Sequence, residues 1–316
     1  MPQAQPLAEP GSAGWEHRAA RDVRVVVVGA GSWGTTFGAL LEERGHDVIV
    51  AGRRSPHVLI ADAPLAEADL VCIAVPSRAF REVVETLPGS APRLILTKGL
   101  DPASGERLSQ VVMDAPVAVL SGPNHAEEIA QGLPAAAVLA SEDQGLADEL
   151  QHAIISPRFR VYVNTDLVGV ELCAAAKNVI ALAAGAVDGL GLGDNAKAAL
   201  IARGLSEMTR LGEACGARSE TFSGLAGMGD LVVTCWSRHS RNRLAGELIA
   251  QGTSPEEAVE SIGMVVEGLT TAPVLRDLAA RLGIELPITE GVCAVLAGAS
   301  LQDLISGLMG RRPTDE

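Results

Sequence analysis

Aromatic residues are scarce in this chain of 316 residues. Phe, Tyr and Trp make up only 3% of it, although hydrophobic residues reach 47%. The interior must therefore be built from Ala, Val, Leu and Ile, a composition that favours helices and parallel strands. Because 316 residues exceed what one hydrophobic core usually supports, two domains are expected.

Cysteines are few and widely scattered. None of the five forms a Cys-x-x-Cys pair, and no histidine stands at metal-ligand spacing from them. This pattern indicates neither a disulfide framework nor a zinc site, so we expect no bound metal.

Positive charge is also in short supply. Lys and Arg number 25 against 39 Asp and Glu, which gives a net charge of −14. This balance argues against nonspecific nucleic-acid binding and against docking on anionic lipid. An anionic substrate would therefore need a locally basic pocket.

Long apolar runs and targeting signals are missing as well. No charge-free apolar run of about 18 residues occurs, and residues 1–20 lack the basic-then-apolar order of a secretion signal. We therefore expect a cytoplasmic protein without membrane insertion. The composition and lack of periodicity of residues 1–20 predict a flexible tail.

Strand and helix patterns alternate in the first half of the chain. Residues 24–28 are continuously apolar, the run Gly-Ala-Gly-Ser-Trp-Gly follows over 29–34, and a helix is predicted over 35–44. In this context the glycines allow a tight turn and close approach of a pyrophosphate to the backbone. We therefore predict a dinucleotide-binding Rossmann-type domain with a mostly parallel sheet over 21–164.

Two arginines follow the second predicted strand, residues 47–51. An Asp or Glu normally holds the adenosine ribose of NAD at this position, but Arg53 and Arg54 stand here instead. Two guanidiniums suit a 2′-phosphate, so charge favours NADP(H) over NAD(H). The alternative is that the arginines stack on the adenine or face solvent.

The segment between residues 54 and 69 is short for a crossover. Pro56 and Pro64 leave only seven residues between them, too few for a normal connecting helix. We expect a loop or a single turn here.

Three further buried strands are predicted over residues 70–75, 94–96 and 117–120. Ligands bind at the carboxyl ends of strands in open α/β sheets. Lys98 and the loop 121–124 follow two of these ends, so we expect them to converge near the reactive ring of the cofactor.

From about residue 165 the strand patterns stop, and an all-α domain is predicted over 165–316. The helices predicted within it are 169–187, 194–212, 241–251, 255–262, 270–282 and 289–297. A glycine-rich run over 221–230 and a basic, hydroxyl-rich patch over 237–243 interrupt this regularity.

Lys177 lies in an apolar, alanine-rich helical stretch. Burying an ammonium costs free energy unless an opposite charge or a hydrogen-bond acceptor pairs with it. Desolvation also lowers the pKa of a lysine toward the range of a general acid or base. The alternative is a lysine whose head reaches solvent between helices.

The basic patch contains Ser240, Arg241 and Asn242. A planar guanidinium binds two phosphate oxygens at once, and Ser and Asn add donors. An exposed helix N-terminus with capping serines would give the same local pattern.

Together these motifs resemble the bacterial NAD(P)-dependent glycerol-3-phosphate dehydrogenases. The segments Gly-Ala-Gly-Ser-Trp-Gly-Thr, Ala-Val-Pro-Ser, Thr-Lys-Gly, Ser-Gly-Pro-Asn, Lys-Asn-Val, Gly-Leu-Ala-Gly-Met-Gly-Asp, Ser-Arg-Asn and Val-Val-Glu-Gly occur in the family order across residues 22–300. The resemblance implies reversible hydride transfer between NAD(P)H and dihydroxyacetone phosphate, giving sn-glycerol 3-phosphate for phospholipid synthesis. It also implies a homodimer.

The resemblance assigns roles by position. Lys177 matches the proton acceptor. The substrate-binding positions are Lys98, Gly122, Asn124, Lys177, Asp230, Ser240, Arg241 and Asn242. The cofactor-binding positions, from the motifs and the resemblance together, are Gly29, Gly31, Ser32, Trp33, Gly34, Arg53, Arg54, Lys98, Ala126, Arg241, Val265 and Glu267.

The chain departs from the family pattern in two places. Asn124 stands where many members have Ser or Thr, which alters the reach of the polar group. The segment 54–69 excludes the adenosine-side helix and the further strand that family members usually have. We therefore expect an intact fold with altered cofactor affinity or altered choice between NAD and NADP.

Two alternative functions stay open. One is a related dehydrogenase of another hydroxy acid, since the architecture is shared. The basic patch at 240–242 argues against a substrate that carries only a carboxylate. The other is a nonenzymatic paralogue that binds a dinucleotide or a phosphometabolite. Retention of Lys98, Lys177 and Asp230 speaks against it, because a sensor needs no proton donor.

Overall fold

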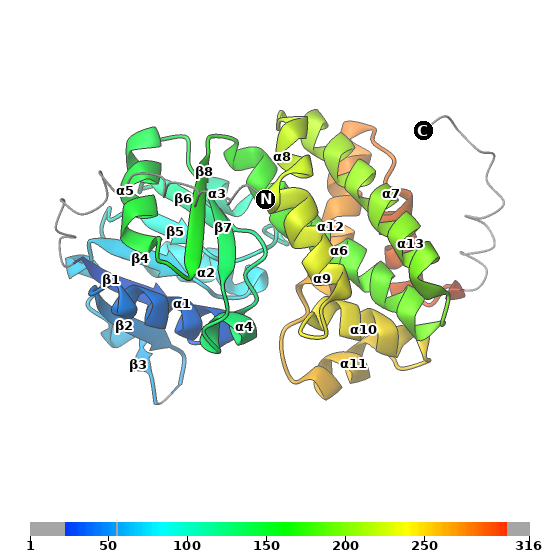
Figure 1. The fold of residues 1–316 in the computed structure, drawn as a ribbon, viewed down its shortest axis with the longest axis horizontal. Helices are drawn as coiled ribbons and strands as arrows, with labels where there is room; N and C mark the ends of the chain where they lie inside the picture. Colours follow the sequence, from blue (N-terminus) through cyan, green and yellow to red (C-terminus); the bar gives the residue numbers. More distant parts are fainter. Residues whose placement is uncertain (1–22, 55, 302–316) are drawn as a thin grey trace, which may run out of the picture.

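The computed structural model describes residues 23–54 and 56–301. A strand-containing half and a helical half lie side by side (Figure 1). The last strand ends at Asn164 and the first long helix of the second half begins at Leu167. The predicted tail over 1–20 lies outside the described residues.

One sheet of eight strands organises the first half, in the order β3-β2-β1-β4-β5-β6-β7-β8. Its strands are β1 Arg24–Val28, β2 Asp47–Gly52, β3 Val58–Leu59, β4 Leu70–Ile73, β5 Arg93–Ile95, β6 Val117–Ser121, β7 Ala135–Ala140 and β8 Phe159–Asn164. Every pairing of the described strands is parallel except that of β6 with β7. The predicted Rossmann-type, mostly parallel sheet is confirmed.

The first strand shows why the strand sequences are continuously apolar. Val25 and Val27 belong to the core on one face of the sheet, and Val26 and Val28 to the core on the other. Helices cover both faces, so neither set of side chains reaches water. The strand order reverses beside β1, at the point where open α/β sheets bind ligands.

Five helices flank this sheet: α1 Ser32–Glu43, α2 Ser77–Thr86, α3 Leu108–Val111, α4 Ala126–Ala130 and α5 Gln144–Ile154. Phe37 of α1 and Leu150 of α5 belong to one core, whereas Phe80 of α2 and Leu108 of α3 belong to the other. Helix α1 begins three residues before the predicted start, directly after Gly31.

The segment between β2 and β4 corrects one expectation. It contains the two-residue strand β3 and two 3₁₀ turns, Ile60–Asp62 and Leu65–Glu67, where a loop or a single turn was predicted. The prolines prevent a crossover helix, as expected. They leave room for the short strand, which pairs with the end of β2.

The described part of the second half, residues 165–301, contains helices and no strand, as predicted. Its elements are α6 Leu167–Gly189, α7 Gly193–Ala214, α8 Ser219–Ser223, the π-helical turn η3 Leu225–Gly229, α9 Asp230–Trp236, α10 Arg241–Ala250, α11 Pro255–Ile262, α12 Glu267–Leu282 and α13 Pro287–Leu296. The glycine-rich run was expected to interrupt the helices, yet it is helical. A Cβ on Gly227 would lie 2.1 Å from the carbonyl oxygen of Phe222, so glycine permits this tight π turn.

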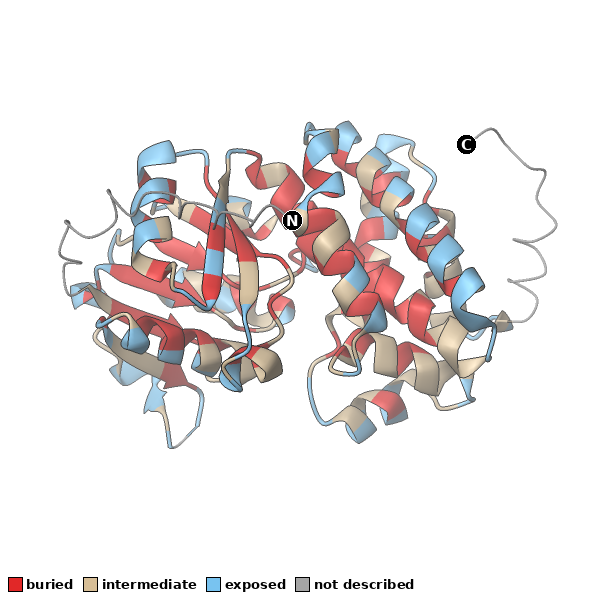
Figure 2. Ribbon diagram, in the orientation of Figure 1, coloured by how far each residue is buried: buried red, intermediate tan, exposed pale blue. Residues whose placement is uncertain are grey.

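Helix α6 lies at the centre of the helical half and is buried on nearly all sides (Figure 2). It has the length and hydropathy of a membrane span, but 89% of that window is buried inside the protein. Helix α10 approaches it closely: a Cβ on Gly185 would lie 1.8 Å from the carbonyl oxygen of Arg243. Alanine and glycine therefore allow backbone-to-backbone packing around α6.

Candidate active site

A cavity of about 770 Å³ lies where the two halves meet. Its walls include the glycine turn after β1, the ends of β2 and β5, the start of α4, and residues of α6, α9, α10 and α12. The sheet contributes its carboxyl edge, which the strand order had indicated as the ligand-binding edge.

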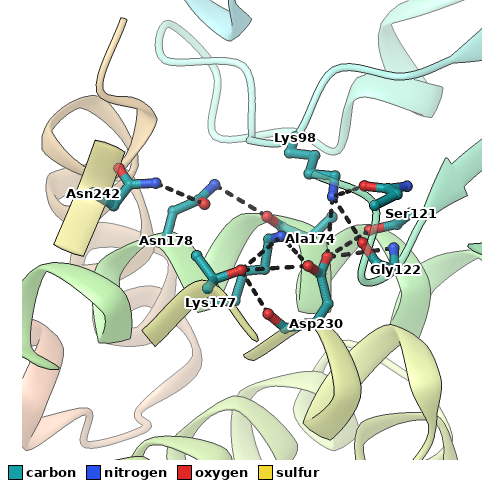
Figure 3. Close-up of polar contacts among 10 residues, drawn as sticks. Lys98, Ser121, Gly122, Ala174, Lys177, Asn178, Asp230 and Asn242 are labelled. Carbon is teal, nitrogen blue, oxygen red and sulfur yellow. Dashed lines mark hydrogen bonds and ion pairs between the residues drawn. The ribbon is translucent and has the colours of Figure 1, made fainter. Parts of the chain in front are cut away.

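Lys177 projects from the middle of α6 and is 4% exposed. Its ammonium forms an ion pair with the Oδ1 atom of Asp230 and donates a hydrogen bond of 3.2 Å to Oγ1 of Thr234. Figure 3 shows the two charged groups pointing toward each other from α6 and α9. The prediction of a buried helix is confirmed, and the lysine does not extend to solvent.

Asp230 joins the two halves of the molecule. Its Oδ2 atom accepts hydrogen bonds from Nζ of Lys98 at 3.1 Å, from Oγ of Ser121 at 3.3 Å and from the backbone N–H of Gly122 at 3.3 Å (Figure 3). Burial raises the pKa of this carboxyl, but the charges of Lys177 and Lys98 outweigh burial and hold it below its usual range. Asp230 is therefore a carboxylate between two ammonium groups.

Lys98 completes the basic centre from the sheet side. Its Nζ atom donates to Oδ1 of Asn124 at 2.8 Å and to the carbonyl oxygen of Gly122 at 3.2 Å. Lys98 and the loop 121–124 thus converge, as the strand ends predicted. The whole chain contains only three lysines, and two of them meet at Asp230.

The environment of Lys177 poises it to exchange a proton near neutral pH. Burial lowers the pKa of its ammonium, the charge of Asp230 raises it and the charge of Lys98 lowers it, and the balance is a pKa of about 7. A group whose pKa lies near the working pH makes an efficient general acid or base.

Unpartnered polar atoms mark the wall of the cavity. Within the described part of the chain, Nδ2 of Asn124, Nε2 of His125 and Nε1 of Trp33 have no hydrogen-bond partner, although each atom is buried. All three residues line the cavity. Buried donors of this kind are usually satisfied by a ligand or an ordered water.

The basic patch forms the start of α10. Ser240 is the N-cap, and its Oγ accepts a 3.2 Å hydrogen bond from the backbone N–H of Arg243. Both Ser240 and Arg241 line the cavity, and Nη1 of Arg241 donates to the carbonyl oxygen of Val265 at 3.2 Å. Ser240 therefore caps α10, as the alternative interpretation predicted, and the same helix N-terminus can still bind a phosphate.

Asn242 links three helices of the second half. Its Nδ2 donates to Oδ1 of Asn178 at 3.0 Å, and its Oδ1 accepts the backbone N–H of Gly268 at 2.8 Å. These contacts position α6, α10 and α12 relative to one another. Asn242 also lines the cavity.

The turn after β1 fits a dinucleotide. Gly29 has a φ of +122°, and a Cβ there would lie 2.6 Å from the backbone of Ala74. A Cβ on Gly34 would lie 1.9 Å from the carbonyl oxygen of Gly29, whereas one on Gly31 would meet nothing within 4 Å. The first and third glycines are needed for packing, and the second leaves the backbone open to an approaching phosphate.

The other predicted cofactor positions surround this turn. Ser32, Trp33, Arg53, Arg54, Ala126, Val265 and Glu267 all line the cavity. Arg53 and Arg54 are exposed at the end of β2. Glu267 accepts hydrogen bonds from the N–H of Ser77 at 3.1 Å and from its Oγ at 2.5 Å, and burial raises the pKa of this carboxyl. Glu267 thereby ties the start of α12 to the start of α2.

Sequence reasoning missed several cavity residues. Thr234 accepts the second hydrogen bond from Lys177, and its spacing of four residues from Asp230 on a helix could have identified it. His125 and His239 also line the cavity, with ring centroids 6.2 Å apart. No sequence signal brings these two histidines together. Among the described residues, no cluster of His, Cys, Asp or Glu could hold a metal ion.

The first half is a nucleotide-binding sheet, and its ligand-binding edge faces the buried Lys177 and Asp230 of the helical half. This arrangement is typical of an NAD(P)-dependent oxidoreductase. Comparison with known proteins agrees. Residues 166–306 match the family model for the NAD-dependent glycerol-3-phosphate dehydrogenase C-terminus, and residues 59–147 match the model for its N-terminus. The chain belongs to the NAD(P)-dependent glycerol-3-phosphate dehydrogenase family.

Individual relatives cover nearly the whole chain. It is 42% identical to the glycerol-3-phosphate dehydrogenase [NAD(P)+] of Bacillus anthracis, over 91% of this chain and 96% of that one. The crystal structure of glycerol-3-phosphate dehydrogenase from Coxiella burnetii has a TM-score of 0.86 at 36% identity and covers 92% of this chain and 99% of that one. The Plasmodium falciparum glycerol-3-phosphate dehydrogenase shares the fold, with a TM-score of 0.80 at 19% identity over 93% and 97% of the two chains.

Proposed function

We propose that this protein interconverts dihydroxyacetone phosphate and sn-glycerol 3-phosphate, with Lys177 as the general acid and base. The observation that carries the proposal is the Lys177–Asp230–Lys98 group. It lies on the wall of the same cavity as the glycine turn and Arg241. The names of the relatives supply the substrate, and the charges of the site are suited to it.

Reduction of the ketone needs a hydride at C2 and a proton at the oxygen of C2. A dihydronicotinamide cofactor would supply the hydride when bound in the cavity. Lys177 donates the proton to the developing alkoxide and becomes a neutral amine, and in the reverse reaction this amine accepts the proton of the hydroxyl group. Lys98 keeps a second positive charge beside the alkoxide, where a preorganised charge stabilises the transition state.

Asp230 has a different part in this scheme. Its two carboxylate oxygens hold Lys177 and Lys98 separately, so both ammonium groups are oriented before substrate enters. Its charge also favours the protonated form of Lys177, because it opposes the lowering of the pKa by burial. Thr234 fixes the position of the Lys177 head with a further hydrogen bond.

The substrate phosphate is assigned to the start of α10. Arg241 supplies a guanidinium on the cavity wall, and Ser240 supplies a hydroxyl at the helix N-terminus. Binding a remote phosphate orients the reacting carbon toward Lys177. The same assignment separates this substrate from a hydroxy acid that carries only a carboxylate.

The remaining assignments follow the division of the molecule. We assign residues 21–164 to dinucleotide binding and 165–316 to substrate binding. Arg53 and Arg54 favour NADP(H), because both border the cavity where the adenosine ribose is expected. A homodimer, a cytoplasmic location and a role in phospholipid synthesis rest on the family resemblance. Sedimentation of the purified protein tests the dimer.

Loss of NADPH or NADH absorbance with dihydroxyacetone phosphate tests the proposed reaction. The comparison is wild type against Lys177→Met, with Arg276→Met as the control because Arg276 is exposed and pairs with the adjacent Asp277. Removing a general acid lowers kcat about 10²- to 10⁴-fold, whereas the control retains most of the wild-type kcat. Absence of turnover by folded wild-type protein with either cofactor refutes the proposed function. Equal kcat in wild type and Lys177→Met refutes the role of the lysine.

A further inference from the structure

Four charged side chains, those of Asp188, Lys197, Arg243 and Glu247, meet behind the start of α10, outside the cavity. Nη1 of Arg243 lies 3.1 Å from a carboxylate oxygen of Glu247, one turn further along α10. Asp188 near the end of α6 accepts Nη1 of Arg243 at 2.5 Å and Nζ of Lys197 at 2.7 Å. The Nζ atom of Lys197 also lies 4.9 Å from the centroid of the Trp236 ring. The side chains of Lys197 and Arg243 are only 5% and 15% exposed, so solvent screens these ion pairs weakly.

Arg243 connects this cluster to the turn that precedes α10. Its Nε donates to the carbonyl oxygen of Ser237 at 3.2 Å, and its backbone N–H donates to Oγ of the N-cap Ser240 at 3.2 Å. The side chain of Arg243 therefore holds the first residue of the turn 237–240, and its backbone N–H holds the last. It does not line the cavity, so it acts on this turn from behind.

The body of α10 is held in another way. A Cβ on Gly185 would lie 1.8 Å from the backbone of Arg243, and one on Gly246 would lie 1.9 Å from the carbonyl oxygen of Leu182. This close backbone packing fixes α10 against α6 without any side chain of the charged cluster. Loss of the Arg243 side chain should therefore loosen the turn and leave the helix in place.

We propose that Arg243, oriented by Asp188 and Glu247, is a positioning residue for the recognition of the phosphate group of the substrate. This inference rests on the proposed function, because it takes Ser240 and Arg241 as the phosphate ligands. Charge-assisted hydrogen bonds to phosphate depend on geometry, and a mobile turn would lose affinity even with both ligands present.

The variant Arg243→Met tests this role with two carbonyl substrates. Weakening one charge-assisted hydrogen bond corresponds to about a tenfold loss of affinity, so KM for dihydroxyacetone phosphate should rise about tenfold. The value of kcat/KM for unphosphorylated dihydroxyacetone should stay within about twofold, since this substrate has no phosphate to position. The inhibition constant of inorganic phosphate should rise in parallel with KM.

Arg276→Met is the matched control, because Arg276 is exposed and pairs with the adjacent Asp277. The double variant Asp188→Asn, Glu247→Gln gives a second test, since it keeps the shapes of the side chains and removes both charges that orient Arg243. Equal losses for the phosphorylated and unphosphorylated substrates in both variants would show a general structural defect and overturn the inference. An unchanged KM in either folded variant would also overturn it. Absence of turnover in wild type would instead contradict the proposed function.

Discussion

The variant Asp230→Asn gives the sharpest test of the catalytic centre, because it removes a charge and keeps the side-chain shape. Two unit charges about 3 Å apart in an effective dielectric of about 20 attract each other by about 5 kcal/mol. Water and neighbouring side chains relax in the variant, so we take less than half of this, about 2 kcal/mol, as the stabilisation of the protonated Lys177 that is lost. This is a factor of about thirty in the protonation equilibrium of Lys177.

The direction of the change follows from the environment of Lys177. The pKa of its ammonium is about 7, because the lowering by burial and by Lys98 outweighs the raising by Asp230. In Asp230→Asn the pKa should therefore fall well below 7. At pH 8 the protonated fraction, and with it kcat/KM for ketone reduction, should drop about thirtyfold. At pH 6 most of Lys177 is protonated in wild type, and a larger fraction of it is protonated in the variant than at pH 8. The loss of kcat/KM should therefore be smaller at pH 6.

The assay is the pH dependence of kcat/KM for dihydroxyacetone phosphate at saturating cofactor. Asp277→Asn is the matched control, because Asp277 is exposed and pairs with Arg276. Thermal unfolding checks that the variant is folded, since the substitution leaves two ammonium groups without their shared carboxylate. Parallel pH profiles, with the same loss at every pH, would refute the argument that Asp230 acts through the protonation of Lys177.

Two further predictions concern the cofactor and the stability of the helical half. Replacing Arg53 and Arg54 together by Ser should lower the ratio of kcat/KM for NADPH to that for NADH by about tenfold or more, the value of one lost charge-assisted contact. An unchanged ratio in steady-state assays with both cofactors would mean that these arginines do not read a 2′-phosphate. Burial raises the pKa of Glu207 to about 7, although its carboxylate accepts the N–H of Ile288 at 2.6 Å. Its stabilising contribution is present at low pH and is lost as pH rises through about 7, so Glu207→Gln should raise the free energy of unfolding by about 2 kcal/mol at pH 8 and by little at pH 5. Urea denaturation at the two pH values measures this, and equal effects would contradict it.

The sequence predicted the sheet best where strands are buried on both faces. The valines of β1 and the apolar runs of β4 and β6 have few other interpretations. Strand β7 was missed because its sequence, Ala-Ala-Ala-Val-Leu-Ala, has the composition of a helix. Strand β8 alternates buried and exposed side chains, and this period of two could have identified it.

Some features of the site could also be predicted from the sequence, and others could not. Lys177 could be singled out because a lone charge in an apolar helix is costly, and its burial follows from the same pattern. The ion pair with Asp230 spans more than fifty residues of sequence, so only the packing of α9 on α6 brings the two groups together. The contacts of Arg243 were missed for the same reason, although its neighbours in the basic patch were identified.

The two ends of the cavity are built from different parts of the chain. The strands β5 and β6 and the helices α6 and α9 supply the reacting centre, and the contacts among Lys98, Asp230 and Lys177 tie these elements together. The adenosine end is bordered by Arg53, Arg54 and the shortened segment that carries β3, whose two residues are exposed. None of the hydrogen bonds of the reacting centre involves this segment. We therefore expect the departure of this segment from the family pattern to alter the affinity for the cofactor and to leave the geometry of proton transfer unchanged.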